Sequence, residues 1–582
     1  MSSNPSFFDY PVPREGPAAP YKNETQSIPV FRGIPLAIGA TVIHNVGFIQ
    51  SHFWRNAGFD VIREIPYLHQ YAARHDPTVI PIDHAHRDGS APTAASVERR
   101  KGNSGYYTSA DYRAMYESGE LTPTAVVETL LPLSQADAIR AAADASTQRY
   151  KQGKPLGPLD GVPVAVKDEV HLTGYKRTVG TKLDFSGGIN ATSWCVKQWE
   201  DAGAIVIGKS TMHELGLDTN NNNPNYGTPR NPHNQDYYCG GSSGGSGYAV
   251  GAGLVPIALG ADGGGSIRIP SSFCGIWGLK TSHSRVSGAP TLSLAASVGV
   301  YGPMAASIDD LALAYRIMAT PAPATQDPVS SQFPHPVPPP ADTKRSKTIG
   351  IVRDWLDRAE PPVRKVLDAA LDHYRQQGYT VIDIAIPYLP EGQRAHTLTI
   401  MAEIASGVDE RQIRQLTAPN KVMVSLGMYQ INAQDLLASQ RLRNLLMTHL
   451  AHLFQTHPGL LIVSPTTPIP GWHIDGGKAD LSHGLSDGKA TVRNMEYVWL
   501  ANFTGCPAIN CPAGYASDSG VPIGVMAMGE WGTEEDLIAF ARDGESILDR
   551  TEEGSTSQGL RIPAAKDALW EDIIALAQKH SE

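Results

Sequence analysis

A strand–helix–strand pattern in the second half of the chain limits the folds that are open to it. The apolar run KTIGIV (347–352) precedes a helical pattern with Val363, Leu367 and Leu371 on one face, and YTVIDIAI (379–386) then resumes as a strand. Two strands joined through a helix pair in parallel, because the crossover returns the second strand in the same direction. A parallel sheet needs helices on its faces, so the pattern predicts an α/β fold.

Further short apolar runs have the length and composition of buried strands. They are GVPVAVK (161–167), AIVIG (204–208), VPIALGAD (255–262), LLIVS (460–464), AINCP (508–512) and IGVMAM (523–528). With 582 residues, of which 41% are hydrophobic, the chain has enough apolar material for one extensive core. We therefore expect an α/β fold with one large single domain, in which helices surround a central mixed β-sheet.

The chain divides into two predicted parts. Residues 1–105 form an N-terminal extension packed on the core, and the extension ends in the polar stretch RDGSAPTAASVERRKGNSG (87–105). This composition is typical of a linker or surface loop. Residues 106–582 form the main domain, and the proline-rich run at 321–340 is predicted to be a surface connection within it.

Two helices are predicted at the start of the main domain. Ser109 can cap the first helix, which Gly119 can end. Thr122 can cap the second helix, because Pro123 then occupies its first position, where the missing N–H costs nothing.

Charge and composition exclude several classes of partner. The formal net charge is −10 and no run of basic residues stands out, which argues against nucleic acid. The longest apolar stretch, GIPLAIGATVI (33–43), is too short to span a bilayer, so we expect a buried helix or strand and no stable membrane insertion. Five unpatterned cysteines and an N-terminus without a secretory signal indicate free thiols in the cytoplasm. The sequence leaves the oligomeric state open, and a homodimer is one expectation.

A glycine-rich loop follows one of the predicted strands. In GADGGGSIRIP (260–270) three glycines lead directly into Ser266. Glycine has no Cβ and suits places where the backbone bends sharply or approaches a ligand closely. An isolated sequence of this kind is most often a surface turn. The alternative is a loop whose N–H groups converge on a reacting oxyanion.

Two serines and a lysine have a spacing that allows them to meet. Ser242 in GGSSGGSG (240–247) precedes Ser266 by 24 residues, which is enough chain for a helix and a strand to leave one sheet edge and return. Lys167 ends a predicted buried strand, where a lysine is ordinarily a solvated surface charge. Held inside the protein, a lysine loses its proton more readily. It can then take a proton from one serine, which takes it from the other.

Other motif matches compete with this interpretation. GAIVIGKS (203–210) fits the phosphate-loop pattern, but its interior is itself strand-like, so we expect no nucleotide site. CGGSSGGSG (239–247) contains G-x-S-x-G around Ser242 and around Ser243, which is typical of an α/β-hydrolase nucleophile elbow. A nucleophile elbow needs a strand before its serine, but the preceding segment RNPHNQDYYC (230–239) is polar and contains proline. A serine esterase that acts through Ser242 or Ser243 is therefore kept only as the alternative. No histidine or cysteine spacing predicts a metal site.

Three ordered motifs resemble the amidase signature family, whose members include fatty acid amide hydrolases, bacterial amidases and the catalytic subunit of a glutamine-dependent amidotransferase. The motifs are GVPVAVKDEV (161–170), GGSSGGSG (240–247) and GADGGGSIRIPSSFCGIWGLKTS (260–282). The resemblance extends from roughly residue 105 to residue 545. It implies an amide-cleaving hydrolase that forms an acyl-enzyme and needs no metal or organic cofactor.

The resemblance also assigns roles to individual residues. Lys167 corresponds to the general base, Ser242 to a proton relay that follows a cis peptide bond, and Ser266 to the nucleophile. The backbone N–H groups that correspond to the oxyanion hole belong to Gly263, Gly264, Gly265 and Ser266. We interpret Asp262 and Arg268 as a structural pair that fixes the loop, the alternative being two independent surface charges. Ser243 is expected to support the site by hydrogen bonding.

The substrate cleft is where this chain departs from the family's pattern. By resemblance, the cleft is lined by Gly216, Leu217, Asp218 and Thr219. However, LDTNNNNPNYG (217–227) differs from the family's Ser-Ser-Thr-Glu-Asn-like stretch, so no known member's substrate is carried over. The predicted partner is a small-molecule amide, with esters also reactive. A glutamine-dependent amidotransferase component, which would need partner subunits and a tRNA complex, is an alternative that the acidic charge and the long extension disfavour.

Overall fold

The computed structural model describes residues 6–23, 29–82, 105–130, 136–340, 345–549 and 569–581. A ten-stranded sheet runs through the molecule in the order β10-β9-β11-β14-β13-β7-β8-β6-β4-β5. Its strands are β4 (Pro163–Lys167), β5 (Ile205–Ser210), β6 (Ile257–Asp262), β7 (Trp277–Lys280), β8 (Val300–Ala305), β9 (Thr348–Ile351), β10 (Thr380–Asp383), β11 (Leu460–Pro465), β13 (Ala508–Tyr515) and β14 (Pro522–Met528).

The sheet is mixed, as the sequence predicts. At one end β4 pairs in parallel with β5 and β6, and at the other β9 pairs in parallel with β10 and β11. The strands between them pair antiparallel. The predicted strand–helix–strand unit is present, with α11 (Pro361–Gln376) between β9 and β10. The predicted α/β class with one central mixed sheet is therefore confirmed.

Two central strands, β7 and β8, are not predicted from the sequence. Each contains glycine, and Pro303 of β8 lies opposite Leu259 of β6 in the register. Proline cannot donate to the ladder and ordinarily argues against a central strand. Composition alone therefore identifies neither segment as a strand.

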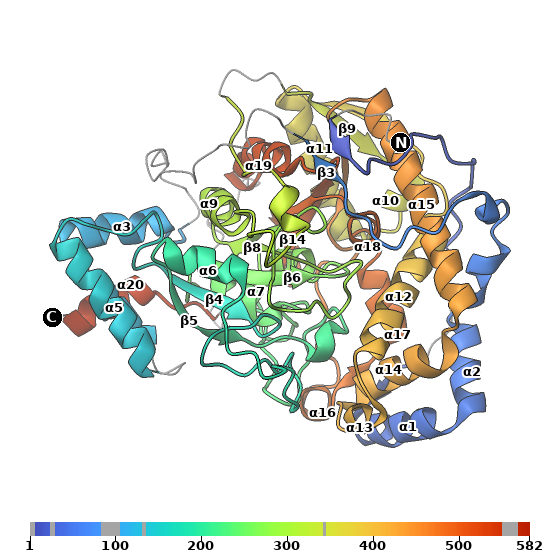
Figure 1. Cartoon of the computed structure of the whole chain (residues 1–582), viewed down its shortest axis with the longest axis horizontal. Helices are drawn as coiled ribbons and strands as arrows, with labels where there is room; N and C mark the ends of the chain where they lie inside the picture. Colours follow the sequence, from blue (N-terminus) through green and yellow to red (C-terminus); the bar gives the residue numbers. More distant parts are fainter. Residues whose placement is uncertain are drawn as a thin grey trace.

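Helices surround the sheet (Figure 1). Those on the sheet side of the molecule are α3 (Ser109–Ser118), α4 (Pro123–Leu130), α5 (Ala136–Lys151), α6 (Trp194–Asp201), α7 (Gly244–Gly251), α8 (Arg268–Phe273), α9 (Ile308–Met318), α10 (Arg353–Leu356), α19 (Glu534–Asp543) and α20 (Ile573–Ser581). A second group stands beside the sheet and comprises α12 (Leu389–Ser406), α13 (Glu410–Ile413), α14 (Ala418–Gln430), α15 (Ala433–Thr456), α16 (Lys478–His483), α17 (Gly488–Asn494) and α18 (Trp499–Thr504).

The start of α3 differs from the prediction by one residue. Thr108, and not Ser109, caps the helix, because the Thr108 side chain accepts from the Asp111 N–H in a capping box. The Ser109 hydroxyl is committed elsewhere, since it donates to the Asp310 carboxylate on α9 at 2.5 Å. Gly119 ends the helix in the left-handed conformation, as predicted.

The second predicted helix also forms. Thr122 accepts from the Ala125 N–H at 3.2 Å, directly before α4. The proline-rich run at 321–340 contains one short 3-10 turn and is otherwise irregular, which agrees with a connection. The predicted linker at 87–105 lies, apart from Gly105, outside the described residues, and the division of the chain there stays a prediction.

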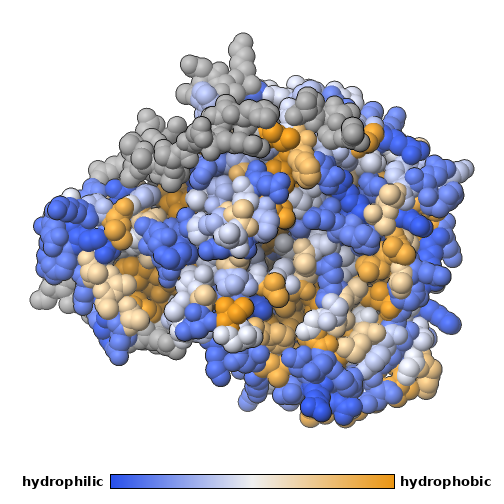
Figure 2. Space-filling view, viewed as in Figure 1, coloured by the Kyte–Doolittle hydropathy of each residue, from blue (hydrophilic) through white to orange (hydrophobic). Residues whose placement is uncertain are grey.

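The apolar stretch at 33–43 lies within α1 (Gly33–Asn45), but this helix is only half-buried. Leu36 and Ile43 pack inward, whereas Ile34 and Ile38 are 64% and 62% exposed, and Figure 2 shows apolar side chains at the surface in this region. The expectation of a fully buried element is therefore wrong for the outer face. Among the described residues no single helix has the length and apolarity needed to cross a membrane. Within the same described residues, α1 and α2 (Gly47–Asn56) together are long and apolar enough, but the chain bends by 105° between them.

The N-terminal segment packs on the second group of helices. Its α1 and α2 contact α14, and the 3-10 helix at Phe59–Glu64 contacts α12 and α15. Two short ladders tie the segment down: β2 (Phe31–Arg32) pairs with β12 (Leu485–Ser486), and β1 (Phe7–Phe8) pairs with β3 (Ile80–Pro81).

Candidate active site

Lys167 and Ser242 meet at the carboxyl end of the parallel strands β4 and β6. Lys167 is the last residue of β4, and its Nζ donates to the Ser242 Oγ at 2.9 Å and to the Ala261 carbonyl oxygen of β6 at 3.1 Å. Both side chains are buried. The lysine head is therefore held inside the protein, which is the condition that the sequence analysis sets for a base.

Ser242 lies in a loop that only small residues can form. The Gly241–Ser242 peptide bond is cis. A Cβ on Gly241 would lie 2.7 Å from the Asn221 N, and one on Gly245 would lie 2.4 Å from the Thr211 carbonyl oxygen. Glycine thus allows this loop and the first turn of α7 to pack directly against the backbone of residues 211–221.

Ser266 joins the same site from the glycine loop between β6 and α8. It is 8% exposed, and its carbonyl oxygen accepts a hydrogen bond from the Ser243 N–H at 3.2 Å. The Ser243 hydroxyl donates to the Ala261 carbonyl oxygen at 3.1 Å. The structure therefore brings the two serine segments together, and Ser243 links the loop that holds Ser242 to β6.

Asp262 and Arg268 form an ion pair with no exposed side-chain surface, the Arg268 Nε being 3.0 Å from the Asp262 Oδ2. The carboxylate also accepts from the Gly265 N–H at 2.7 Å and from the Ile267 N–H at 3.1 Å. Burial alone would raise the pKa of Asp262, but the Arg268 guanidinium and these backbone donors hold it well below its usual range. The pair is thus internal and fixes the loop, and the alternative of two surface charges is wrong.

The same contacts divide the amides of the glycine loop into two sets. The Gly265 N–H is occupied by Asp262, whereas none of the described residues accepts a hydrogen bond from the N–H of Gly263, Gly264 or Ser266. These three residues line a cavity of about 250 Å³ that Lys167 also lines. The family resemblance implies that all four amides belong to the oxyanion hole, but in this structure the Gly265 N–H donates to Asp262 and is not free for that role.

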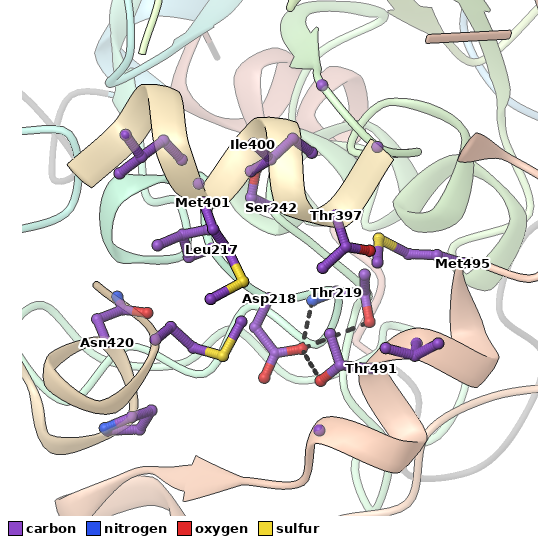
Figure 3. Close-up of a pocket in the computed structure, with 18 of the residues that line it drawn as sticks. Leu217, Asp218, Thr219, Ser242, Thr397, Ile400, Met401, Asn420, Thr491 and Met495 are labelled. Carbon is purple, nitrogen blue, oxygen red and sulfur yellow. Dashed lines mark hydrogen bonds between the residues drawn. The ribbon is translucent and has the colours of Figure 1, made fainter. Parts of the chain in front are cut away.

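The four predicted cleft residues, Gly216, Leu217, Asp218 and Thr219, all line this cavity. A Cβ on Gly216 would lie 3.5 Å from the Ser242 Oγ, so the cleft begins directly beside the predicted relay. Opposite them, α12 presents Thr397, Ile400 and Met401 (Figure 3). Further apolar wall comes from the N-terminal segment, through Phe31, Ile43, Phe53 and Phe59.

Asp218 is the acidic group in the part of the wall drawn in Figure 3. Its Oδ1 accepts from the Thr219 N–H at 2.6 Å and from the Thr491 hydroxyl at 2.9 Å, and its φ of 128° is unusual for a residue with a side chain. Burial raises the pKa of Asp218 to about 7. The carboxyl group thus ties the cleft loop to α17.

Glu169 is a site residue that the sequence analysis missed. Its Oε2 lies 2.9 Å from the Lys167 Nζ, and its side chain is 10% exposed and lines the cavity. The chain turns directly after β4, with the Val170 N–H donating to the Lys167 carbonyl oxygen at 3.3 Å, and this turn brings Glu169 back to the lysine head. The sequence does not reveal this contact, because the adjacent acidic residues of KDEV (167–170) are typical of a solvated surface.

The competing motifs do not have the structures that their functions need. GAIVIGKS forms β5, so no phosphate-binding loop lies between its glycines. Ser242 is approached through isolated bridges at Tyr237 and Tyr238, and no strand is described between Arg230 and Cys239. The described residues contain no group of three or more histidine, cysteine or acidic side chains placed to hold a metal ion, and the five cysteines are buried free thiols.

Comparison with known proteins decides the family. A family model described as Amidase matches residues 124–538. This chain belongs to the amidase family. The predicted resemblance and the predicted enzyme class, an amide-cleaving hydrolase, are thereby confirmed.

Relatives of this amidase include proteins with different reported activities. The fatty acid amide hydrolase of Medicago truncatula is 33% identical over 470 residues, which cover 76% of each chain. A glutamyl-tRNA(Gln) amidotransferase subunit from Thermus thermophilus is 30% identical over 467 residues, covering 74% of this chain and 95% of that one. A bacterial aryl acylamidase of the amidase signature family shares the fold, with a TM-score of 0.64 at 23% identity over 79% of this chain and 99% of its own.

Proposed function

We propose that this amidase hydrolyses amides of long apolar carboxylic acids, with Ser266 as nucleophile, Ser242 as proton relay and Lys167 as base. The observation that carries the proposal is the buried hydrogen bond of 2.9 Å from the Lys167 Nζ to the Ser242 Oγ. A lysine in this position can move a proton through the serine that it contacts. The hydrogen bond from the Ser243 N–H to the Ser266 carbonyl oxygen, at 3.2 Å, supports the approach of the second serine.

In the proposed reaction, Ser266 attacks the amide carbonyl carbon while its proton moves to Ser242 and the Ser242 proton moves to an uncharged Lys167. The negative charge on the carbonyl oxygen faces the N–H groups of Gly263 and Gly264, which need no reorganisation to receive it. The proton returns through Ser242 to the leaving nitrogen, and the C–N bond breaks. Water then attacks the acyl-enzyme through the same relay and releases the carboxylic acid.

The acyl specificity rests on the composition of the cavity wall. Leu217, Ile400, Met401, Val422 and Met423 join the N-terminal aromatic residues around the space. An extended apolar chain that buried its surface there would gain a binding free energy of roughly 25 cal/mol per Å² of apolar surface. The name of the Medicago truncatula relative, a fatty acid amide hydrolase, points to the same class of substrate.

The identity of the acylated serine tests this function against the esterase alternative. We expect a fluorophosphonate probe to label the peptide that contains Ser266, as read by peptide mass spectrometry. Ser266→Ala should abolish labelling, while Ser242→Ala and Lys167→Ala should slow labelling by about a hundredfold and leave any adduct on Ser266. A label on Ser242 or Ser243 in the unmutated protein would support the esterase mechanism instead.

The amidotransferase relative, which is 30% identical, favours a second candidate function, transfer of glutamine-derived ammonia within a complex. Co-purification of the natively expressed chain with stoichiometric partner proteins would support it. We propose instead that a small-molecule amide is the main partner of this chain. We also propose a cytoplasmic location, because five buried free thiols suit a reducing compartment, and a homodimer, which light scattering would test.

A further inference from the structure

His396 on α12 contacts the glycine loop directly. Its Nε2 lies 2.8 Å from the Gly263 carbonyl oxygen. That oxygen can only accept, so Nε2 carries the ring proton and donates it. The imidazole is buried and is bordered by the rings of Trp499 and Phe503. A Cβ on Gly264 would lie 3.0 Å from its Cε1, so ring and loop are in close contact.

The Gly263 carbonyl matters because of the amide on the other side of the same peptide bond. In a trans peptide the C=O and the following N–H point in opposite directions. A Gly263 oxygen held toward His396 therefore turns the Gly264 N–H away from His396. Gly264 lines the cavity, and none of the described residues accepts from its N–H.

Neighbouring peptide planes in the loop are held in a similar way. The Asn502 Nδ2 donates to the Asp262 carbonyl oxygen at 2.8 Å, and the Asp262 carboxylate accepts from the Gly265 N–H. Consecutive glycines have little conformational preference of their own. Side chains from outside the glycines must therefore set the orientation of each plane, and His396 holds the plane between Gly263 and Gly264.

We propose that His396 is a positioning residue that aims the Gly264 N–H at the oxyanion of the tetrahedral intermediate. The proposal rests on the proposed function, in which Ser266 is the nucleophile beside that amide. His396 acts through the backbone and does not itself touch the substrate. Its effect should appear in the transition state, where the oxyanion forms, and be small for the bound substrate.

The burial of His396 determines its charge. Burial lowers the pKa of His396 to about 4, with Arg443 and Arg268 opposing and Asp262 favouring its charged form. The ring is therefore neutral near pH 7. Its Nδ1 is buried and has no partner among the described residues, so the ring has one role, as a donor to Gly263.

Two substitutions of nearly equal shape separate this role from packing. Glutamine at position 396 keeps an N–H donor at about the reach of the imidazole Nε2, whereas methionine has similar length and volume without the donor. We would measure kcat and KM for a long-chain anilide, and the inhibition constant of a trifluoromethyl ketone with the same acyl chain. That ketone forms a tetrahedral adduct that mimics the intermediate. Fluorophosphonate labelling of each variant would verify that Ser266 is the acylated residue.

We expect His396→Met to lower kcat by about tenfold to a hundredfold, less than the loss of a whole oxyanion donor. The binding of the trifluoromethyl ketone should weaken in the same proportion, KM should change less than about threefold, and His396→Gln should recover most of the loss. Equal losses in both variants, or no loss in His396→Met, would overturn the proposal. Labelling at a serine other than Ser266 in the parent enzyme would instead overturn the proposed function.

Discussion

Glu169 gives Lys167 a charged neighbour at 2.9 Å in addition to its hydrogen bonds with Ser242 and Ala261. Of these three partners Glu169 is the one that carries a formal charge, and a contact with a charged group is stronger than one between neutral groups. His213 also lies close to this lysine, and burial lowers the pKa of His213 to about 4, so it is uncharged near pH 7. Glu169 is therefore expected to hold the Lys167 head in place beside Ser242.

Replacement of Glu169 by glutamine should lower kcat/KM for an amide substrate by about tenfold. The change keeps the shape of the side chain but replaces an ionic contact with the Lys167 Nζ by a weaker neutral hydrogen bond, so the lysine head is held less firmly beside Ser242. We would measure kcat/KM with an amide for which chemistry is rate-limiting. Glu200→Gln on α6 makes the same chemical change away from the cavity and provides the matched control, whose kcat/KM should equal that of the parent. An unchanged kcat/KM in Glu169→Gln would show that this carboxylate does not position the lysine.

Arg268→Met should destabilise the protein strongly, because it leaves the Asp262 carboxylate buried without its partner. Loss of one member of a buried pair costs about 3–5 kcal/mol. The pair holds the pKa of Asp262 well below its usual range, so its stabilisation is present above about pH 4 and is lost as the pH falls. Denaturant unfolding should therefore show a large difference from the parent at pH 7 that shrinks below about pH 4. An equal difference at both pH values would contradict this electrostatic origin.

At the residue scale, the sequence singles out the proposed catalytic groups, but not all of their partners. Lys167, Ser242 and Ser266 stand out because they lie in glycine-rich or strand-end motifs that constrain the backbone locally. His396 lies 133 residues from Gly263 and reaches it only through the packing of α12 beside the glycine loop. A contact over that separation leaves no local pattern.

The glycine loop between β6 and α8 shows at the element scale which of its glycines the fold requires. Gly265 has a φ of +106°, and a Cβ there would lie 2.5 Å from the Val498 Cγ2. At Gly263 the nearest atoms to a Cβ would be 4.0 Å away. The two positions belong to the same run of three glycines, yet they differ in how much space and conformational freedom they need.

Gly265→Ala should lower the free energy of unfolding by about 2 kcal/mol or more, from left-handed backbone strain together with overpacking. Gly263→Ala is the control for folding, and its thermal midpoint should stay within about 2 °C of the parent. Both midpoints can be read by differential scanning fluorimetry. Equal midpoints for the two variants would show that the loop adapts to a side chain at either position.

Elements with a continuous apolar pattern were predictable, and those held by their neighbours were not. The strands β4, β6 and β11 are buried throughout, and each coincides with an apolar run in the sequence. By contrast, β8 keeps Pro303 in a central position because β6 and β7 flank it. The cap of α3 lies at Thr108 because a distant carboxylate, Asp310, engages Ser109.

At the scale of the whole molecule, the cavity is a joint product of distant parts of the chain. The end that holds the proposed catalytic residues is built by β4, β6 and the loops after them, and α12 forms the opposite wall. The N-terminal segment adds Phe31, Phe53 and Phe59, and its helices lie on the outer side of α14, away from the sheet (Figure 1). From the sequence this segment is predicted to be an extension packed on the core, with no residue in the site.

Phe53→Ala should therefore reduce the selectivity of the enzyme for long acyl chains. The Phe53 ring lines the cavity and packs 6.2 Å from the Phe31 ring, so its removal takes apolar surface from the far wall and none from the end that holds the proposed catalytic residues. Losing most of one buried aromatic contact should lower kcat/KM for long-chain anilides by about tenfold. Rates for short-chain anilides should stay nearly unchanged, because a short chain occupies only the space beside Ser266.

Phe48→Ala on the same helix is the matched control, because Phe48 is 77% exposed and does not line the cavity. It removes the same side chain from α2 and should leave the chain-length profile unaltered. A series of anilides with short, medium and long acyl chains, measured for both variants and the parent, separates the two outcomes. If Phe53→Ala lowered kcat/KM equally for all chain lengths, the N-terminal wall would support the fold of the site without contacting the acyl chain, and the proposed long-chain specificity would lose its structural basis.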